Sequence, residues 1–180
     1  MKLAHAFVLA MSFGVALGEG QAQPAGAPCE ASPTPAFAQE ALDRINQFRA
    51  SKRSCGRRGS FAPARALTWN GWLAQAADAH SRDMAQRNYF SHDSRDGRNL
   101  KDRVEAAGYA WRALGENIAA GAPTVPVVMA GWQRSDEHCA NLMNPEFTEV
   151  GLACMPSPAG AAYKTYWTMD FGRPRRGKAD

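Results

Sequence analysis

Apolar residues recur at the three-to-four-residue spacing of α-helices along the first part of the chain. Thr34 is a suitable N-cap and Pro35 suits a first helical turn, so a helix is predicted to begin there and to end before Cys55. The segment 57–65 contains glycine, serine and proline without periodicity and is predicted to be a loop. The apolar face of this first helix comprises Phe37, Ala41, Ile45 and Phe48.

Three more helices follow from the same pattern. Asn70 is a good cap for a second helix whose apolar face includes His80, so this histidine is predicted to point toward the core. A third helix is predicted over 99–108, where an asparagine begins it and a glycine stops it. The fourth covers 124–135, and helical spacing places Ser135 on the face of the tryptophan one turn earlier.

Beyond the fourth helix the period changes from helix to strand. Apolar residues alternate over 148–154 and again over 163–171, and a glycine- and proline-containing turn at 156–160 separates the two runs. This pattern predicts an antiparallel pair, and the short stretch 115–119 suits another strand. Helices early, strands late and a helix between strands favour an α+β layered fold over a doubly wound parallel sheet.

The N-terminal residues have the character of a targeting segment. A short basic start precedes an apolar run that is too short to span a bilayer comfortably, so residues 1–22 are predicted to be a removed signal peptide rather than an uncleaved anchor. Residues 23–33, rich in alanine, proline and glycine, are predicted to form a flexible leader. A single domain is expected over 34–172, followed by a basic disordered tail at 173–180.

The net charge of +4 does not indicate a nucleic-acid partner. Much of the positive excess lies in two clusters, Lys52–Arg58 and Arg173–Lys178, where a solvated loop and a frayed tail are the simpler explanations. We expect no nucleic acid as a partner, no transmembrane segment in the mature chain, and a monomer.

Four cysteines in a chain with an export signal fit an oxidising compartment. They permit three pairings, and the sequence alone does not choose among them. We favour Cys29 with Cys55 and Cys139 with Cys154, because each pair brackets one local unit. Since no CxxC spacing occurs, the cysteines are not expected to bind metal.

Three sets of residues stand out together and resemble the CAP superfamily of cysteine-rich secretory proteins, antigen 5 and plant pathogenesis-related proteins. Their order and spacing across 37–172 carry the resemblance, which is strongest to short bacterial SCP-like extracellular domains. The sets are Ala79–Ala85 with Asn88–His92 and Asp96–Arg98; Gly115–Ala119; and Gly131-Trp132, Ser135, His138, Asn141-Leu142, Phe147–Gly151 and Tyr166–Gly172.

The resemblance implies a three-layer α-β-α sandwich with an antiparallel sheet. It also implies a central cleft that holds two histidines and two acidic residues. Carried over by position, His92 and His138 are the histidines and Glu116 is the first acid. The second acid falls on Ser135, which can donate and accept hydrogen bonds but carries no charge.

The chemistry of this cleft has several interpretations. His92, Glu116 and His138 can form a zinc site with one open position, at which a bound water would be activated for hydrolysis. No His-Glu-x-x-His motif supports that assignment. Without metal, the two imidazoles can exchange protons with a substrate while Glu116 orients one of them. The simplest alternative is a structural hydrogen-bonded network.

Other candidate residues carry less weight. His80 is expected to be a core histidine bonded to the backbone rather than a metal ligand. Ser91 precedes His92, but no Gly-x-Ser-x-Gly turn surrounds it, so nucleophilic catalysis is not expected. The tryptophans are expected to pack in the core, with Trp111 as the one to test for exposure.

The sequence therefore favours a secreted or periplasmic binding module. Its cleft, formed by His92, Glu116, Ser135 and His138, is suited to a divalent metal, a small apolar ligand such as a lipid, or an envelope component. The alternative is a zinc-dependent, peptidase-like hydrolase that uses the same residues, and a third class is a structural domain whose partner binds the outer helices. Fold resemblance does not decide among these functions.

Overall fold

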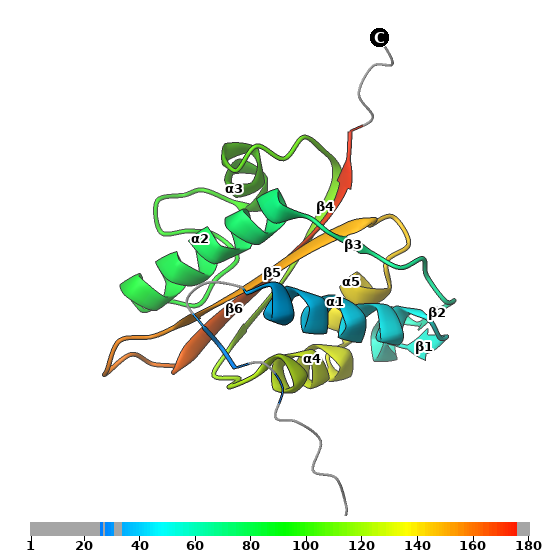
Figure 1. The fold of residues 1–180 in the computed structure, drawn as a ribbon, viewed down its shortest axis with the longest axis horizontal. Helices are drawn as coiled ribbons and strands as arrows, with labels where there is room; N and C mark the ends of the chain where they lie inside the picture. Colours follow the sequence, from blue (N-terminus) through cyan, green and yellow to red (C-terminus); the bar gives the residue numbers. More distant parts are fainter. Residues whose placement is uncertain (1–25, 27, 31–33, 176–180) are drawn as a thin grey trace, which may run out of the picture.

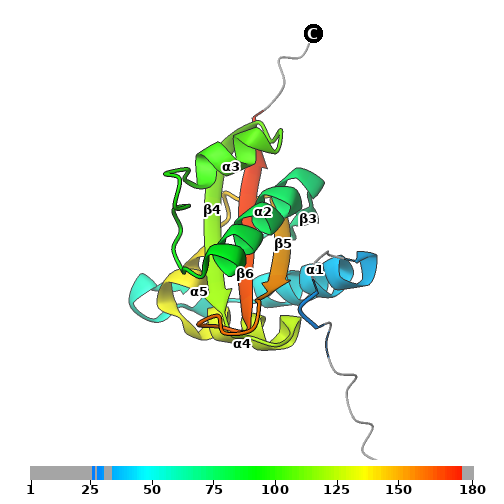
Figure 2. The same ribbon diagram turned by 90° about the vertical axis from the view of Figure 1, so that its left-hand side faces the viewer.

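A four-stranded sheet lies between two helical layers (Figure 1). The computed structural model describes residues 26, 28–30 and 34–175. The predicted α+β sandwich of three layers is confirmed. Figures 1 and 2 show α2 and α3 on one face of the sheet and the other three α-helices on the opposite face. The helices are α1 (Pro35–Arg49), α2 (Gly71–Arg87), α3 (Leu100–Ala106), α4 (Val125–Arg134) and α5 (Asp136–Met143).

The sheet has the strand order β3-β5-β6-β4. β5 (Glu149–Pro156) pairs antiparallel with β6 (Thr165–Pro174), as the alternating pattern predicted, and β4 (Trp111–Ala120) also pairs antiparallel with β6. The two-residue β3 (Thr68–Trp69) pairs parallel with β5, so the sheet is mixed rather than purely antiparallel. A strand of this length leaves no alternating pattern in the sequence, which is why it was missed.

A second, small sheet lies at the end of α1. β1 (Arg53–Ser54) and β2 (Ser60–Phe61) form an antiparallel ribbon around the short 3-10 helix η1 (Gly56–Arg58). β2 lies within the stretch 57–65 that was predicted to be a loop, whereas β1 lies where the first helix was predicted to continue; that helix ends earlier, at Arg49. The ribbon brings η1 against α5.

Three of the four predicted helix starts are confirmed by capping hydrogen bonds; Thr124, at the start of α4, makes none. The Thr34 side chain accepts a hydrogen bond from the backbone of α1, and the Asn70 side chain accepts two from the first turn of α2. Asn99 and Asp102 form a reciprocal capping box at α3. These side chains satisfy backbone N–H groups that have no partner inside the helix, which is why local sequence is enough to locate them.

Ser135 departs from the prediction. Its backbone is extended (φ −93°, ψ 126°), so it ends α4 and caps α5 instead of continuing the face of Trp132. The Ser135 carbonyl accepts a hydrogen bond from the Cys139 N–H at 2.8 Å, which begins the new helix. The chain thus turns at the residue that stands where the family has its second acid.

α2 packs directly onto the sheet at Gly151 of β5. A side chain at this position would collide with the backbone of Leu73 and Ala74, so glycine allows the helix and the strand to approach closely. The larger apolar core lies on the opposite face of the sheet and includes Trp132 and Trp167. α2 is therefore held close to the strands that carry the polar site described below.

Both predicted disulfides are wrong. The structure pairs Cys29 with Cys154 and Cys55 with Cys139, with Cα–Cα distances of 5.5 and 5.4 Å. The residues joined are 125 and 84 positions apart in the sequence, so the assumption that each bridge closes a local unit fails. Tertiary packing decides the pairing, because it brings Cys29 to β5 and η1 to α5.

The predicted chain ends are only partly described. Residues 1–22, the predicted signal peptide, lie outside the described residues, as does 176–180. Within the predicted leader, the Cys29 N–H donates to the Pro123 carbonyl at 3.0 Å, so this point is attached to the domain. β6 continues to Pro174, beyond the predicted end of the domain. Over the described ranges, no helix combines the length and the apolar character needed to cross a bilayer.

Candidate functional site

His92 and Glu116 are in direct contact. Glu116 lies on β4 and is 7% exposed, whereas His92 lies on the segment between α2 and α3. Their Nδ1 and Oε1 atoms are 2.7 Å apart, and because a carboxylate oxygen only accepts, Nδ1 carries the proton. The hydrogen bond to Glu116 raises the pKa of His92. The His92 side chain is 58% exposed.

Arg103 completes this contact and was not anticipated from the sequence. It lies on α3, is 4% exposed, and its Nη2 is 2.6 Å from Glu116 Oε2. Burial opposes ionisation of Glu116, but the hydrogen bond from His92 and the positive charge of Arg103 hold its pKa below the ordinary value. Glu116 is therefore a buried carboxylate that both neighbours stabilise.

Asp170 is a second buried carboxyl group beside Glu116. It lies directly opposite Glu116 in the β4–β6 register and is fully buried. Burial raises the pKa of Asp170 well above its usual range, and the negative charge of Glu116 raises it further. Neither Asp170 oxygen accepts a hydrogen bond from the described residues. Burial and the neighbouring carboxylate together favour the protonated form of Asp170.

His80 is the backbone-bonded core histidine that the sequence predicted. It is fully buried in α2, and its Nε2 lies 2.9 Å from the Ser91 carbonyl oxygen, to which it donates. Burial lowers the pKa of His80, which keeps the ring neutral. Its role is to anchor the start of the segment that carries His92.

His138 approaches the site from the other helical layer. Its ring packs 6.5 Å, between ring centroids, from that of Trp132. Burial lowers the pKa of His138 and the charge of His92 lowers it further. The backbone is docked on β4, because Asn117 Nδ2 donates to the His138 carbonyl at 3.1 Å and Asn141 Nδ2 donates to the Glu116 carbonyl at 3.1 Å.

The four predicted cleft residues are thus not all in contact with one another. His92 and Glu116 touch, whereas His138 interacts with His92 through charge. Ser135 lies at the junction of α4 and α5, and within the described chain its hydroxyl makes no hydrogen bond. The second carboxyl group comes instead from Asp170 on β6, which the family comparison by position did not indicate.

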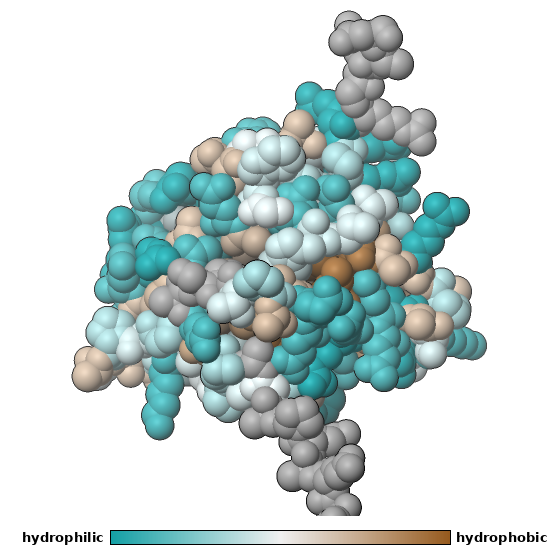
Figure 3. Space-filling view, in the orientation of Figure 1, coloured by the Kyte–Doolittle hydropathy of each residue, from teal (hydrophilic) through white to brown (hydrophobic). Residues whose placement is uncertain are grey.

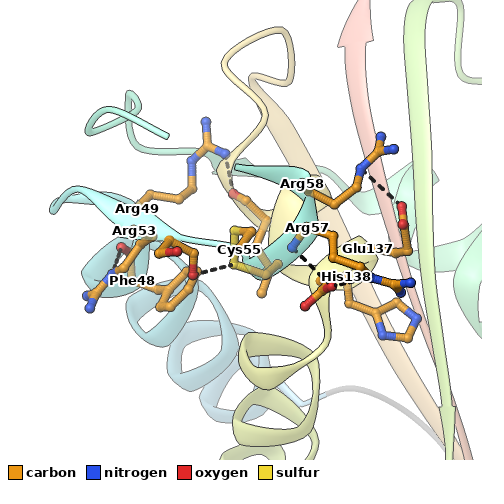
Figure 4. The surroundings of a disulfide bond; sticks show 12 residues. Phe48, Arg49, Arg53, Cys55, Arg57, Arg58, Glu137 and His138 are labelled. Atoms are coloured by element: carbon orange, nitrogen blue, oxygen red, sulfur yellow. Dashed lines mark hydrogen bonds and ion pairs between the residues drawn. A yellow bond between two sulfur atoms is a disulfide. The ribbon is translucent and has the colours of Figure 1, made fainter. Parts of the chain in front are cut away.

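The start of α5, which carries His138, is held by a covalent bond and two ion pairs (Figure 4). Cys139 is bonded to Cys55 beside η1. Figure 4 shows the His138 ring pointing away from this disulfide. The ion pairs are Arg57 with Asp136 at 2.9 Å and Arg58 with Glu137 at 3.2 Å.

The arrangement does not fit the three-ligand zinc site that the sequence suggested. Both Glu116 oxygens are used, one by His92 and the other by the Arg103 guanidinium. Over the described residues, no group of three or more histidine, cysteine or acidic side chains is placed to hold a metal ion. A permanent positive charge beside the only carboxylate of the set disfavours a second cation there.

An open groove of about 510 Å³ lies beside His92. Apolar side chains from α3 and β4 form one part of its lining, and charged or polar side chains form the rest. Trp111 is partly exposed in this groove, and its indole N–H donates to Glu105 at 2.9 Å. The lining residues are His92, Asp93, Asn99, Leu100, Lys101, Trp111, Leu114 and Glu116.

A second groove, of about 610 Å³, lies between α1 and α2 and includes Leu42 and Trp69. Figure 3 shows a small hydrophobic patch beside α1, at the position of β3 in Figure 1, within a mostly hydrophilic face. None of the cleft residues lines it. The polar contact between His92 and Glu116 adjoins the other groove.

A layered α-β-α fold with a histidine–carboxylate site at one edge strand defines an SCP-type domain. The model of the cysteine-rich secretory protein family, CAP, matches residues 42–171. The chain belongs to this family.

Relatives with related sequences are bacterial. The chain is 34% identical over 99 residues to the protein YkwD and 38% identical over 105 residues to the membrane protein YlbC, both of Bacillus subtilis (strain 168). The matches cover 55% and 58% of this chain but only 36% and 28% of those relatives. A solved extracellular SCP-domain protein of Bacillus anthracis is 31% identical with a TM-score of 0.62, over 76% of this chain and 40% of that one.

Proposed function

We propose that the chain is a secreted or periplasmic CAP module, with its domain over 34–172, that binds an amphipathic ligand in the groove beside His92. The observation that carries the proposal is the combined lining of that groove. Three apolar side chains, Leu100, Trp111 and Leu114, adjoin the exposed imidazole and the ammonium group of Lys101. Ligand sites are typically concave and largely apolar with a few polar groups that orient the ligand.

The charges of the groove favour a ligand with an anionic head. Lys101 is exposed at the groove, and the hydrogen bond to Glu116 raises the pKa of His92 toward a charged imidazolium. Asp93 is the opposing acid in the lining, while Glu116 is already paired with Arg103. Two disulfides and the extracellular description of the Bacillus anthracis relative support an oxidising location.

The test is a calorimetric titration of the purified chain with laurate, a single-chain anionic amphiphile, below its micelle concentration. Trp111→Ala removes apolar contact worth about 1.5–3 kcal/mol, so we expect the affinity to fall about tenfold or more. Trp72→Ala is the matched control, because Trp72 is 55% exposed and outside the groove. Absence of binding, or an equal loss in both variants, contradicts the proposal.

The zinc hydrolase is not advanced as a second candidate. It requires ligands that converge on one ion with an open position, and the pairing of Glu116 with Arg103 opposes that arrangement. Acid–base chemistry without metal remains compatible with the paired His92 and Glu116, but no observed contact identifies a scissile bond.

A further inference from the structure

Arg103 joins three parts of the site that are separate in the sequence. Its Nη2 donates to Glu116 on β4. Its Nη1 donates to the carbonyl oxygens of His92 at 2.9 Å and Arg98 at 3.3 Å. Both residues lie on the segment between α2 and α3. The Arg103 side chain is buried, whereas Arg98 and Lys101, which precede it in the sequence, are exposed. One buried guanidinium therefore contacts the carboxylate and the segment that carries the imidazole.

The charge of this group balances that of the carboxylate. A carboxylate taken out of water needs a partner of opposite charge with good geometry, and Arg103 supplies one at 2.6 Å. With Glu116 paired, a divalent ion at the same carboxylate would lie beside a fixed positive charge in a region of low dielectric. The repulsion between two cations is strong under these conditions.

We infer that Arg103 is the resident cation of the site: it takes the charge-balancing place beside Glu116 that a metal ion would need, and it fixes the segment bearing His92. A metal ion would hold this segment through a histidine ring, but Arg103 holds it through backbone carbonyls. The imidazole is thereby left available to the groove. The inference does not depend on which ligand the groove takes.

Zinc titration of the full chain by calorimetry tests the exclusion of metal. The unaltered protein is expected to show no saturable zinc binding. Arg103→Gln removes the charge, so its affinity for zinc is expected to be at least tenfold higher than that of the unaltered protein. Substitution of a purely structural residue would not raise the affinity. The gain should disappear when His92→Ala is added. Arg98→Gln is the matched control, because it removes an exposed guanidinium from the same segment, and it should behave like the unaltered protein.

A second variant keeps the test decisive if Arg103→Gln fails to fold. Arg103→Lys keeps the charge but lacks the planar fork that contacts two carbonyls and a carboxylate. It should still exclude zinc, while amide hydrogen exchange over 91–99 becomes faster. Tight zinc binding by the unaltered protein that is lost in His92→Ala overturns the inference. So does a folded Arg103→Gln without a gain, or an Arg103→Lys with unchanged exchange.

Discussion

The two histidines of the site are held by different kinds of interaction. His92 lies on a segment without helix or strand and is held by the buried charges of Glu116 and Arg103. His138 lies in a helix whose start is tied by the Cys55–Cys139 disulfide and by exposed ion pairs. The contrast indicates that the position of His92 depends on the protonation states of the buried groups around it. The position of His138 depends instead on an oxidising environment, which preserves the disulfide.

Loss of a disulfide should have the largest effect on stability. The chain-entropy relation for loops closed over 84 and 125 residues gives about 4–5 kcal/mol for each bridge. Cys55→Ser with Cys139→Ser should therefore destabilise the protein about as much as Cys29→Ser with Cys154→Ser. Only the first pair of substitutions should also alter the NMR signals of His138, because only that bridge adjoins it.

Guanidinium chloride unfolding and histidine NMR measure the two effects, and peptide mapping of the unaltered protein checks the pairing itself. If both double variants shift the His138 signals alike, the disulfide beside α5 has no special role in placing that ring. If neither does, Asn117 and Asn141 alone hold the helix on β4.

Breaking the buried ion pair should have the next largest effect. Glu116→Gln leaves Arg103 buried without a charge partner, which costs about 3–5 kcal/mol for pairs of this kind. It also removes the hydrogen bond that raises the pKa of His92, so that pKa should fall toward its ordinary value. The measurements are the free energy of unfolding and the NMR titration of His92.

Glu137→Gln is the matched control on the His138 side. Both partners of the Arg58–Glu137 pair are more than half exposed, so its loss should cost less than about 1 kcal/mol. Equal costs for the two glutamine substitutions would contradict the distinction between a buried and a solvated half of the site.

The sequence predicts the parts of this fold that depend on neighbouring residues. The caps at Thr34, Asn70 and Asn99 satisfy backbone groups within one turn, so the helices begin where the pattern indicates. The family motif likewise brings His92 to Glu116. The eight-residue α5 was missed, because the chain beyond the fourth helix was predicted to change from helical to strand spacing, whereas Ser135 separates two consecutive helices.

The predictions that were wrong or missing concern features that depend on contacts between residues far apart in the sequence. The disulfides follow from packing between distant elements, and Arg103 resembles any surface arginine until α3 is placed against β4. A signal for Asp170 was present but was not used. It stands between Met169 and Phe171, at the alternate position of the strand predicted over 163–171. Since the resemblance implies helical layers on both faces of the sheet, a carboxyl group at that position needs a buried partner. Only the β4–β6 register identifies that partner as Glu116.

Asp170, on the His92 side, is expected to have an effect on stability that changes gradually with pH. Burial and the charge of Glu116 raise its pKa in the folded protein above the value of about 3.9 in an unfolded chain. The contribution of this group to stability is therefore full below about pH 3.9, and it is lost as the pH rises through the folded pKa. Asp170→Asn keeps the shape of the side chain but cannot ionise.

The free energy of unfolding of Asp170→Asn relative to the unaltered protein should thus increase with pH, by up to about 1.4 kcal/mol per unit. Denaturant unfolding at a series of pH values measures this difference. Trp72→Ala, which changes an exposed side chain that does not titrate, should give a profile parallel to that of the unaltered protein. A parallel profile for Asp170→Asn as well would mean that Asp170 is ionised in the fold. The His92 side would then carry two buried negative charges, on Glu116 and Asp170, against the one guanidinium of Arg103. A proton that balances the second negative charge would have to lie on the His92 ring.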